Sequence, residues 1–122
     1  MLAGQPGTGH GRTATFLGAL FESLATLSVR VFAQPEGAAV SHIRTRAGER
    51  EVDLIVEDSA GRVIAIEVKL SDTVTDADVR HLRWLSARPG VKVVDAIVIT
   101  TGSHAYRRPD GIGVVPLALL GP

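Results

Sequence analysis

Three charged residues near the middle of the chain have the types and spacing of a metal-dependent hydrolytic site. Glu67 and Lys69 flank Val68, and Asp53 lies fourteen positions before Glu67. Because side chains alternate along a strand, Glu67 and Lys69 should project from the same face. A carboxylate and an ammonium group are costly to bury without partners. A metal site is one interpretation of this pair, and an ion pair at the end of a half-exposed strand is the other.

A second carboxylate favours the metal-site interpretation. Asp53 is expected on a strand, on the face opposite Val52 and Leu54, although aspartate is a poor strand former. A turn near Gly61 would place this strand beside the next one, with Asp53 within reach of Glu67. Two carboxylates beside a lysine form an oxygen-rich site suited to Mg²⁺ or Mn²⁺. A solvated strand residue is the alternative interpretation of Asp53.

A third acid and several basic groups are weaker candidates. Glu22 follows Phe21 inside an apolar helical segment, where a lone glutamate is usually solvated. Arg80 is one of several arginines suited to phosphate contacts, and His81 is a candidate accessory acid–base group. Surface or packing roles are the alternatives for these residues.

The first elements that must position these groups are a helix and three strands. Apolar residues recur at three- and four-residue spacing after Thr13 and predict a helix that runs toward Gln34: Phe16, Leu17, Leu20, Phe21, Leu24 and Leu27. Pro35 and Gly37 should end this helix. Alternating apolar and polar residues, separated by short turns, then predict an antiparallel meander of three strands at 39–46, 50–58 and 62–70.

The second half of the chain is expected to add a helix and two strands. Residues 72–87 predict a helix that is capped by Thr73 or Thr75 and buries Val79, Leu82 and Leu85. Residues 93–100 are nearly all apolar, as in a strand covered on both faces. A loop that includes Tyr106 should lead to a short final strand near 112–115. The order predicts an α/β sandwich.

Length and composition indicate one domain at 13–122 after a flexible lead-in at 1–12. The chain has 122 residues, of which 45% are hydrophobic, enough for a core. Cysteine is absent, which excludes disulfides and thiolate metal sites. We see no apolar run of about 20 residues and no secretory signal, so we expect a cytoplasmic protein without a membrane partner.

The charge balance argues against a strong grip on nucleic acid. Thirteen basic residues match thirteen acidic ones, whereas a dedicated DNA-binding domain usually carries net positive charge. Any contact with DNA would therefore depend on local patches and a bridging metal ion.

A family resemblance follows from Phe21-Glu22, Glu51-Val52-Asp53 and Ile66-Glu67-Val68-Lys69-Leu70-Ser71. In this order they resemble the C-terminal domain of unknown function that follows AAA+ ATPase modules in many bacterial and archaeal proteins. That domain is similar to archaeal Holliday-junction resolvases and belongs to the restriction-endonuclease-like, or PD-(D/E)xK, superfamily. The resemblance covers roughly residues 16–120.

The resemblance implies a restriction-endonuclease-like sandwich, with a central mixed sheet, an αβββαβ core and a short final strand. It also implies that Asp53 and Glu67 bind Mg²⁺ or Mn²⁺, with the Val68 carbonyl and Glu22 as further ligands. Lys69 would orient or help to deprotonate the attacking water. Asp53, Glu67, Lys69 and Glu22 would then form the catalytic set of a deoxyribonuclease.

Three functional hypotheses remain open from the sequence. The first is a metal-dependent nuclease acting on DNA, and the second is a non-catalytic regulatory or partner-binding domain derived from an AAA+ ATPase protein. The third is a structural remnant whose charges form an ion-pair network. Since related resolvases work as dimers, a homodimer is also considered, with the apolar tail Val114–Leu120 either at its interface or in the core.

Overall fold

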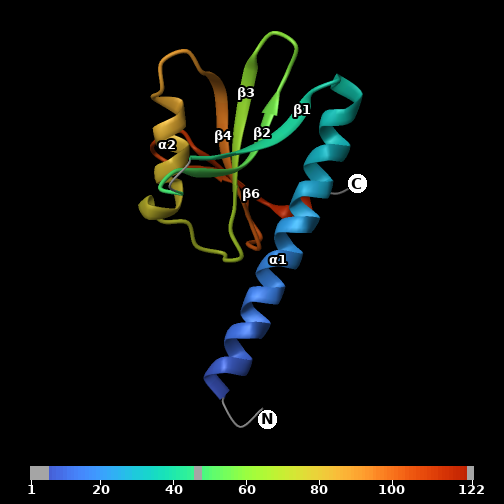
Figure 1. Ribbon diagram of the computed structural model, residues 1–122, viewed down its shortest axis with the longest axis vertical. Coiled ribbons are helices and arrows are strands. Elements are labelled where there is room, and N and C mark those ends of the chain that lie inside the picture. Colours follow the sequence, from blue (N-terminus) through green and yellow to red (C-terminus); the bar gives the residue numbers. More distant parts are fainter. Residues whose placement is uncertain (1–5, 46–47, 121–122) are drawn as a thin grey trace.

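The computed structural model describes residues 6–45 and 48–120, with side chains from Phe16 onward, and shows an α/β fold. One six-stranded mixed sheet lies between two α-helices (Figure 1). In chain order the elements are α1 (Pro6–Ala33), the 3₁₀ helix η1 (Gln34–Glu36), β1 (Ala39–Arg44), β2 (Glu51–Glu57), β3 (Arg62–Val68), η2 (Asp76–Val79), α2 (Arg80–Ser86), β4 (Lys92–Thr100), β5 (Tyr106–Arg107), β6 (Gly113–Pro116) and η3 (Leu117–Leu119).

The strands are arranged in the order β1-β2-β3-β4-β6-β5. The antiparallel meander of β1, β2 and β3 is as predicted. After α2 the chain returns as β4, which pairs parallel to β3, and β6 pairs parallel to β4. The prediction of a loop around Tyr106 was wrong in part, because Tyr106–Arg107 forms the edge strand β5 against β6. Two residues are too few to produce an alternating pattern.

The sheet separates two groups of buried side chains. The α2-side core contains residues of the sheet together with Val79, Leu82 and Leu85 from the second helical segment. The α1-side core joins residues of β2, β3 and β4 to Phe21, Ala25 and Val29 of α1. The helices therefore cover opposite faces of the sheet (Figure 1).

Helix α1 begins earlier than Thr13. It starts at Pro6, a residue favoured at the first helical position because its fixed φ suits the helix. Residues 1–5 of the expected lead-in lie outside the described residues. The predicted end is confirmed: α1 stops at Ala33, and Gly37 adopts a left-handed φ of 68° after η1.

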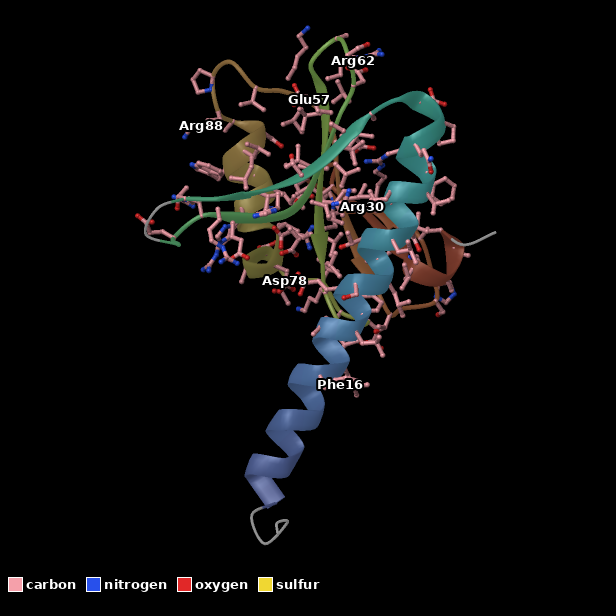
Figure 2. The ribbon with its side chains drawn as sticks, turned by 45° about the vertical axis from the view of Figure 1, so that its right-hand side comes forward. Phe16, Arg30, Glu57, Arg62, Asp78 and Arg88 are labelled. Atoms are coloured by element: carbon pink, nitrogen blue, oxygen red, sulfur yellow. The ribbon has the colours of Figure 1, made fainter. Side chains whose placement is uncertain are left out.

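The apolar face of α1 that the periodicity identified is not the face that contacts the sheet. Phe21, Ala25, Val29 and Ala33, spaced four residues apart, are the buried ones. Six other large apolar residues of α1 are 45–60% exposed: Phe32 and five that we call the leucine seam, namely Leu17, Leu20, Leu24, Leu27 and Val31. Phe16 is also exposed, on the part of the helix that projects beyond the sheet (Figure 2).

One segment meets the length and composition of a membrane span. Residues Phe16–Glu36 form it, and 17% of its most apolar window is buried. The expectation that the chain has no apolar run of about 20 residues is therefore wrong. Core helices and signal sequences satisfy the same criteria, so the cytoplasmic location stays a prediction.

The second helical segment is shorter than predicted. It begins at Thr75, whose side chain forms a reciprocal capping box with Asp78, and it continues as η2 and α2 to Ser86. The preceding residues form local contacts instead, including a 3.1 Å hydrogen bond from the Thr73 N–H to Ser71 Oγ. The predicted buried positions are confirmed.

The C-terminal tail belongs mainly to the core. Val114 is 2% exposed and Pro116 is fully buried, whereas Leu119 is 60% exposed. Leu117 and Leu120 pack against the α1-side core. Of the two roles considered for this tail, the structure supports the core.

Candidate metal site

A β-bulge positions Asp53. Ser41 pairs with Ile55, but Ile43 pairs with Val52, so two residues of β2 lie opposite one residue of β1. The two are Asp53 and Leu54. A bulge of this kind redirects side chains and breaks the simple alternation of the strand.

The bulge also corrects a prediction about the faces of β2. Val52, Leu54 and Val56 were expected on one face. Instead Val52 lies in the α2-side core, while Leu54 and Val56 lie on the α1 side. Ile55 joins Val52 on the α2 side, which the predicted alternation did not allow.

Asp53 is adjacent to Glu67 at the end of the β2–β3 ladder. The last paired residues are Leu54 and Ile66, so Asp53 and Glu67 come next in register. Asp53 Oδ2 accepts a 2.8 Å hydrogen bond from the Val68 N–H. This contact fixes the Asp53 carboxylate beside β3. It involves the Val68 N–H rather than the Val68 carbonyl, whose role as a ligand stays a prediction.

Glu67 is the most perturbed acid near this position. Its Oε1 atom is buried and has no hydrogen-bond partner among the described residues. Burial, followed by repulsion from the Asp53 carboxylate, raises the pKa of Glu67 to about 9. A buried carboxyl group in this state gains from a proton or from a cation.

Lys69 does not join the two acids directly. Its Nζ forms an ion pair with Asp78 Oδ2, in the capping box of η2. Asp78 also accepts hydrogen bonds of 2.7 Å from the Thr75 N–H and 2.9 Å from Thr75 Oγ1. Desolvation raises the pKa of Asp78, but the bonds from Lys69 and Thr75 outweigh it and hold the pKa below its usual value. Neither spacing nor periodicity in the sequence indicated that Lys69 would pair with Asp78.

A pocket of about 360 Å³ opens onto the two acids. It is lined by Asp53 and Glu67 together with Gly48, Glu49, Glu51, Arg80 and His81. His81 Nδ1 accepts a 2.7 Å hydrogen bond from the Glu51 N–H, so the neutral ring carries its proton on Nε2. The pocket is therefore lined by four acids, of which Asp53 and Glu67 come from neighbouring strands, and by two basic side chains from α2.

Glu22 lies on α1, is exposed, and lines a different hollow with Ser23, Thr26 and Arg30. Desolvation, followed by the charges of Asp53 and Glu51, raises its pKa. Glu22 is therefore within electrostatic reach of Asp53 and Glu51, but it does not line the pocket that contains Asp53 and Glu67.

The donor set fits a cation that retains most of its water. Among the described residues, no three His, Asp or Glu side chains form a complete ligand group. Mg²⁺, however, is commonly held by one or two carboxylates plus water and substrate phosphate. Asp53 and Glu67 supply that minimum, and the unpaired Glu67 Oε1 is a suitable ligand atom.

A larger pocket of about 590 Å³ lies elsewhere, between α1 and the sheet. Its lining is largely apolar, with Arg62 and Asp58 held together in a 2.6 Å ion pair. The titratable groups with the chemistry of a metal site are in the smaller pocket, so we place the candidate site there.

Comparison with known proteins gives one match. Residues 17–120 match the family described as Domain of unknown function (DUF4143). The chain belongs to this family. No curated protein and no solved structure matches it significantly. The DUF4143 match runs from within α1 through η3, so the bulge and the two acids lie within the family's domain.

Proposed function

We propose that this DUF4143 domain is a restriction-endonuclease-like, metal-dependent nuclease that hydrolyses DNA phosphodiester bonds. The proposal rests chiefly on the adjacent Asp53 and Glu67 carboxylates, one of which has a buried oxygen without a partner. The order of elements supports it, because α1, a three-stranded meander, α2 and β4 follow one another in the αβββαβ order expected for that superfamily. An association with an AAA+ ATPase module belongs to the same proposal.

Asp53 and Glu67 would hold Mg²⁺ or Mn²⁺. When bound, the ion would polarise a phosphoryl oxygen and lower the pKa of a coordinated water. Glu22 would act through water, since it lies outside the pocket. Arg80 lines the pocket and is exposed, so its guanidinium can contact a substrate phosphate.

Hydrolysis adds water across a phosphorus–oxygen bond, so one proton leaves the water and one reaches the departing oxygen. His81 lines the pocket, and its Nε2–H would donate a hydrogen bond to the departing oxygen. Because the His81 ring is neutral, the departing oxygen would take its proton from water, and the proton of the attacking water would pass to solvent. Lys69 would orient the water after exchanging its contact with Asp78 for one with the substrate. In this proposal the Lys69–Asp78 ion pair is the arrangement of the protein before substrate binds.

Metal binding is tested first, because it precedes catalysis. A metal-free sample is melted with and without Mn²⁺ or Mg²⁺, in parallel with Asp53→Asn, which retains an oxygen to accept the Val68 N–H. At about a hundredfold excess over Kd, a bound ion stabilises the folded state by about 2.7 kcal/mol. We expect the melting temperature of the unsubstituted protein to rise by several degrees and that of the variant to stay unchanged.

Glu57→Gln is the matched control. Glu57 is an exposed carboxylate on the same strand, outside the pocket, so its loss should leave the metal-dependent shift intact. No metal shift in the folded, unsubstituted protein would contradict the proposal. If the shift is present, plasmid, branched and single-stranded DNA are then incubated with the protein. We expect weak cleavage that disappears in Asp53→Asn, because the neutral net charge gives little affinity for phosphate.

A non-catalytic regulatory or partner-binding domain is the second candidate. The observation in its favour is that Asp78, rather than the two acids, holds the Lys69 ammonium. Metal-dependent stabilisation without cleavage of any DNA would support this candidate over the nuclease.

A further inference from the structure

The leucine seam of α1 forms a second apolar face with regular spacing. Its members follow one another at steps of three, four, three and four residues. They are 46%, 45%, 47%, 60% and 58% exposed in chain order. The residues that α1 buries against the sheet instead follow steps of four, so the two faces are distinct.

A strict alternation of three and four residues has a period of 3.5, which is the repeat of a coiled coil. Each apolar side chain on such a seam inserts between side chains of a facing helix. A helix that packs on a sheet needs no such repeat, and the buried stripe of α1 lacks it. The spacing therefore points to another helix as the partner of this face.

We propose that the partner is α1 of a second copy of this chain, so that the protein forms a homodimer through the leucine seam. The seam positions are all Leu or Val and carry no charge, so the same surface on two copies meets without repulsion. A two-fold arrangement brings identical patches together and closes the assembly at two subunits.

The available area agrees with a dimer. The seam and Phe16 together expose on the order of 600 Å² per copy, close to the roughly 800 Å² per partner of a standard interface. Side chains that flank the seam supply the remainder. An apolar strip of this size is also larger than most patches that a monomer leaves in water.

A lipid surface explains these residues less well. Lipid chains do not require a repeat of 3.5 residues, and helices that lie on membranes carry several Lys or Arg residues on the polar face. Between Phe16 and Glu36, Arg30 is the single basic residue of the sequence. The observations favour a protein helix.

Sedimentation of the whole chain, over a wide range of concentrations, tests the proposal. We expect a dimer for the unsubstituted protein and a monomer for Leu24→Lys and for Leu27→Lys. Both side chains are exposed in the single chain, so both variants should fold, which circular dichroism verifies. Ser86→Lys is the matched control, since Ser86 is exposed on α2, which covers the face of the sheet opposite α1, and this variant should remain a dimer.

Three results would overturn the proposal. One is a monomeric unsubstituted protein, and another is a dimer that persists in both seam variants, which would place the interface elsewhere. The third is co-sedimentation with neutral phosphatidylcholine vesicles that the seam variants abolish, in a protein that is otherwise monomeric. None of these results depends on metal binding, so the nuclease proposal is tested separately.

Discussion

Glu67 carries a carboxyl group whose ionisation is unfavourable in the folded protein. Burying a carboxylate beside another is unfavourable, and the raised pKa of Glu67 is the measure of that cost. Structural ion pairs would lower the pKa of an acid, as they do for Asp78 and Asp95. Glu67 is half-buried, its Oε1 atom is buried without a partner, and Asp53 lies beside it, which supports the proposed metal site over a purely structural role.

Replacing Glu67 with Gln should stabilise the metal-free protein at pH 8. Because the folded-state pKa of Glu67 is about 9, above its ordinary value of 4.5, the carboxyl group costs stability as the pH rises through that range. Gln has no proton to lose, so the advantage of the variant should grow from pH 5 to pH 9. Urea unfolding at several pH values measures this.

The same variant should lose the stabilisation by Mn²⁺, because an amide is a poor ligand for a hard cation. Glu57→Gln serves again as the control and should show neither effect. A Glu67→Gln variant that is less stable than the parent at every pH would mean that the carboxylate has a structural partner.

At the residue scale the sequence predicted the two acids but not all of their surroundings. The ExK spacing and the preceding Asp53 were enough to bring Asp53 and Glu67 together. The partner of Lys69 depends on where η2 begins relative to β3, which strand periodicity does not determine. The position of Glu22 depends on which face of α1 contacts the sheet.

At the element scale, α2 is held by a small number of fully buried side chains. Leu82 is 0% exposed in the α2-side core, so Leu82→Ala should leave a cavity and destabilise the domain by about 2–5 kcal/mol. Leu119, which is 60% exposed, provides the comparison, and Leu119→Ala should cost less than about 0.5 kcal/mol. Chemical denaturation measures both. Equal effects would show that α2 does not pack as described.

Helix α1 and the strands differ in how well the sequence predicted them. In each strand of the meander, apolar and polar residues alternate, and each strand adjoins a short turn. These two features together define which residues form the strand. Helix α1 has apolar residues around much of its surface, so periodicity predicts the helix but not its orientation. The bulge at Asp53 was also not predictable, because one extra residue in β2 leaves no signature in the alternating pattern.

At the scale of the whole molecule, opposing ionisations should determine how stability depends on pH. Asp78, Asp95 and Asp110 have pKa values below the ordinary value of 3.8, so their contribution to stability is lost as the pH falls below about 4. Glu67 and Glu22 have raised pKa values, so their contribution is lost as the pH rises above 4.5. The metal-free protein should therefore be most stable in mildly acidic solution.

Thermal melts from pH 3 to pH 9 measure this optimum. Adding Mn²⁺ should move it to higher pH, because the ion binds the deprotonated carboxylates. A metal-free optimum at pH 8 would contradict the raised pKa of Glu67.

The irregular pairing of β1 with β2 has a consequence for behaviour at high concentration. β1 is an edge strand with four of its six residues exposed, and such edges can recruit strands from other chains. The interruption near His42 disturbs the regular hydrogen-bonding row that an added strand needs. Growth of amyloid-like fibrils from this edge is therefore disfavoured, even in crowded solution.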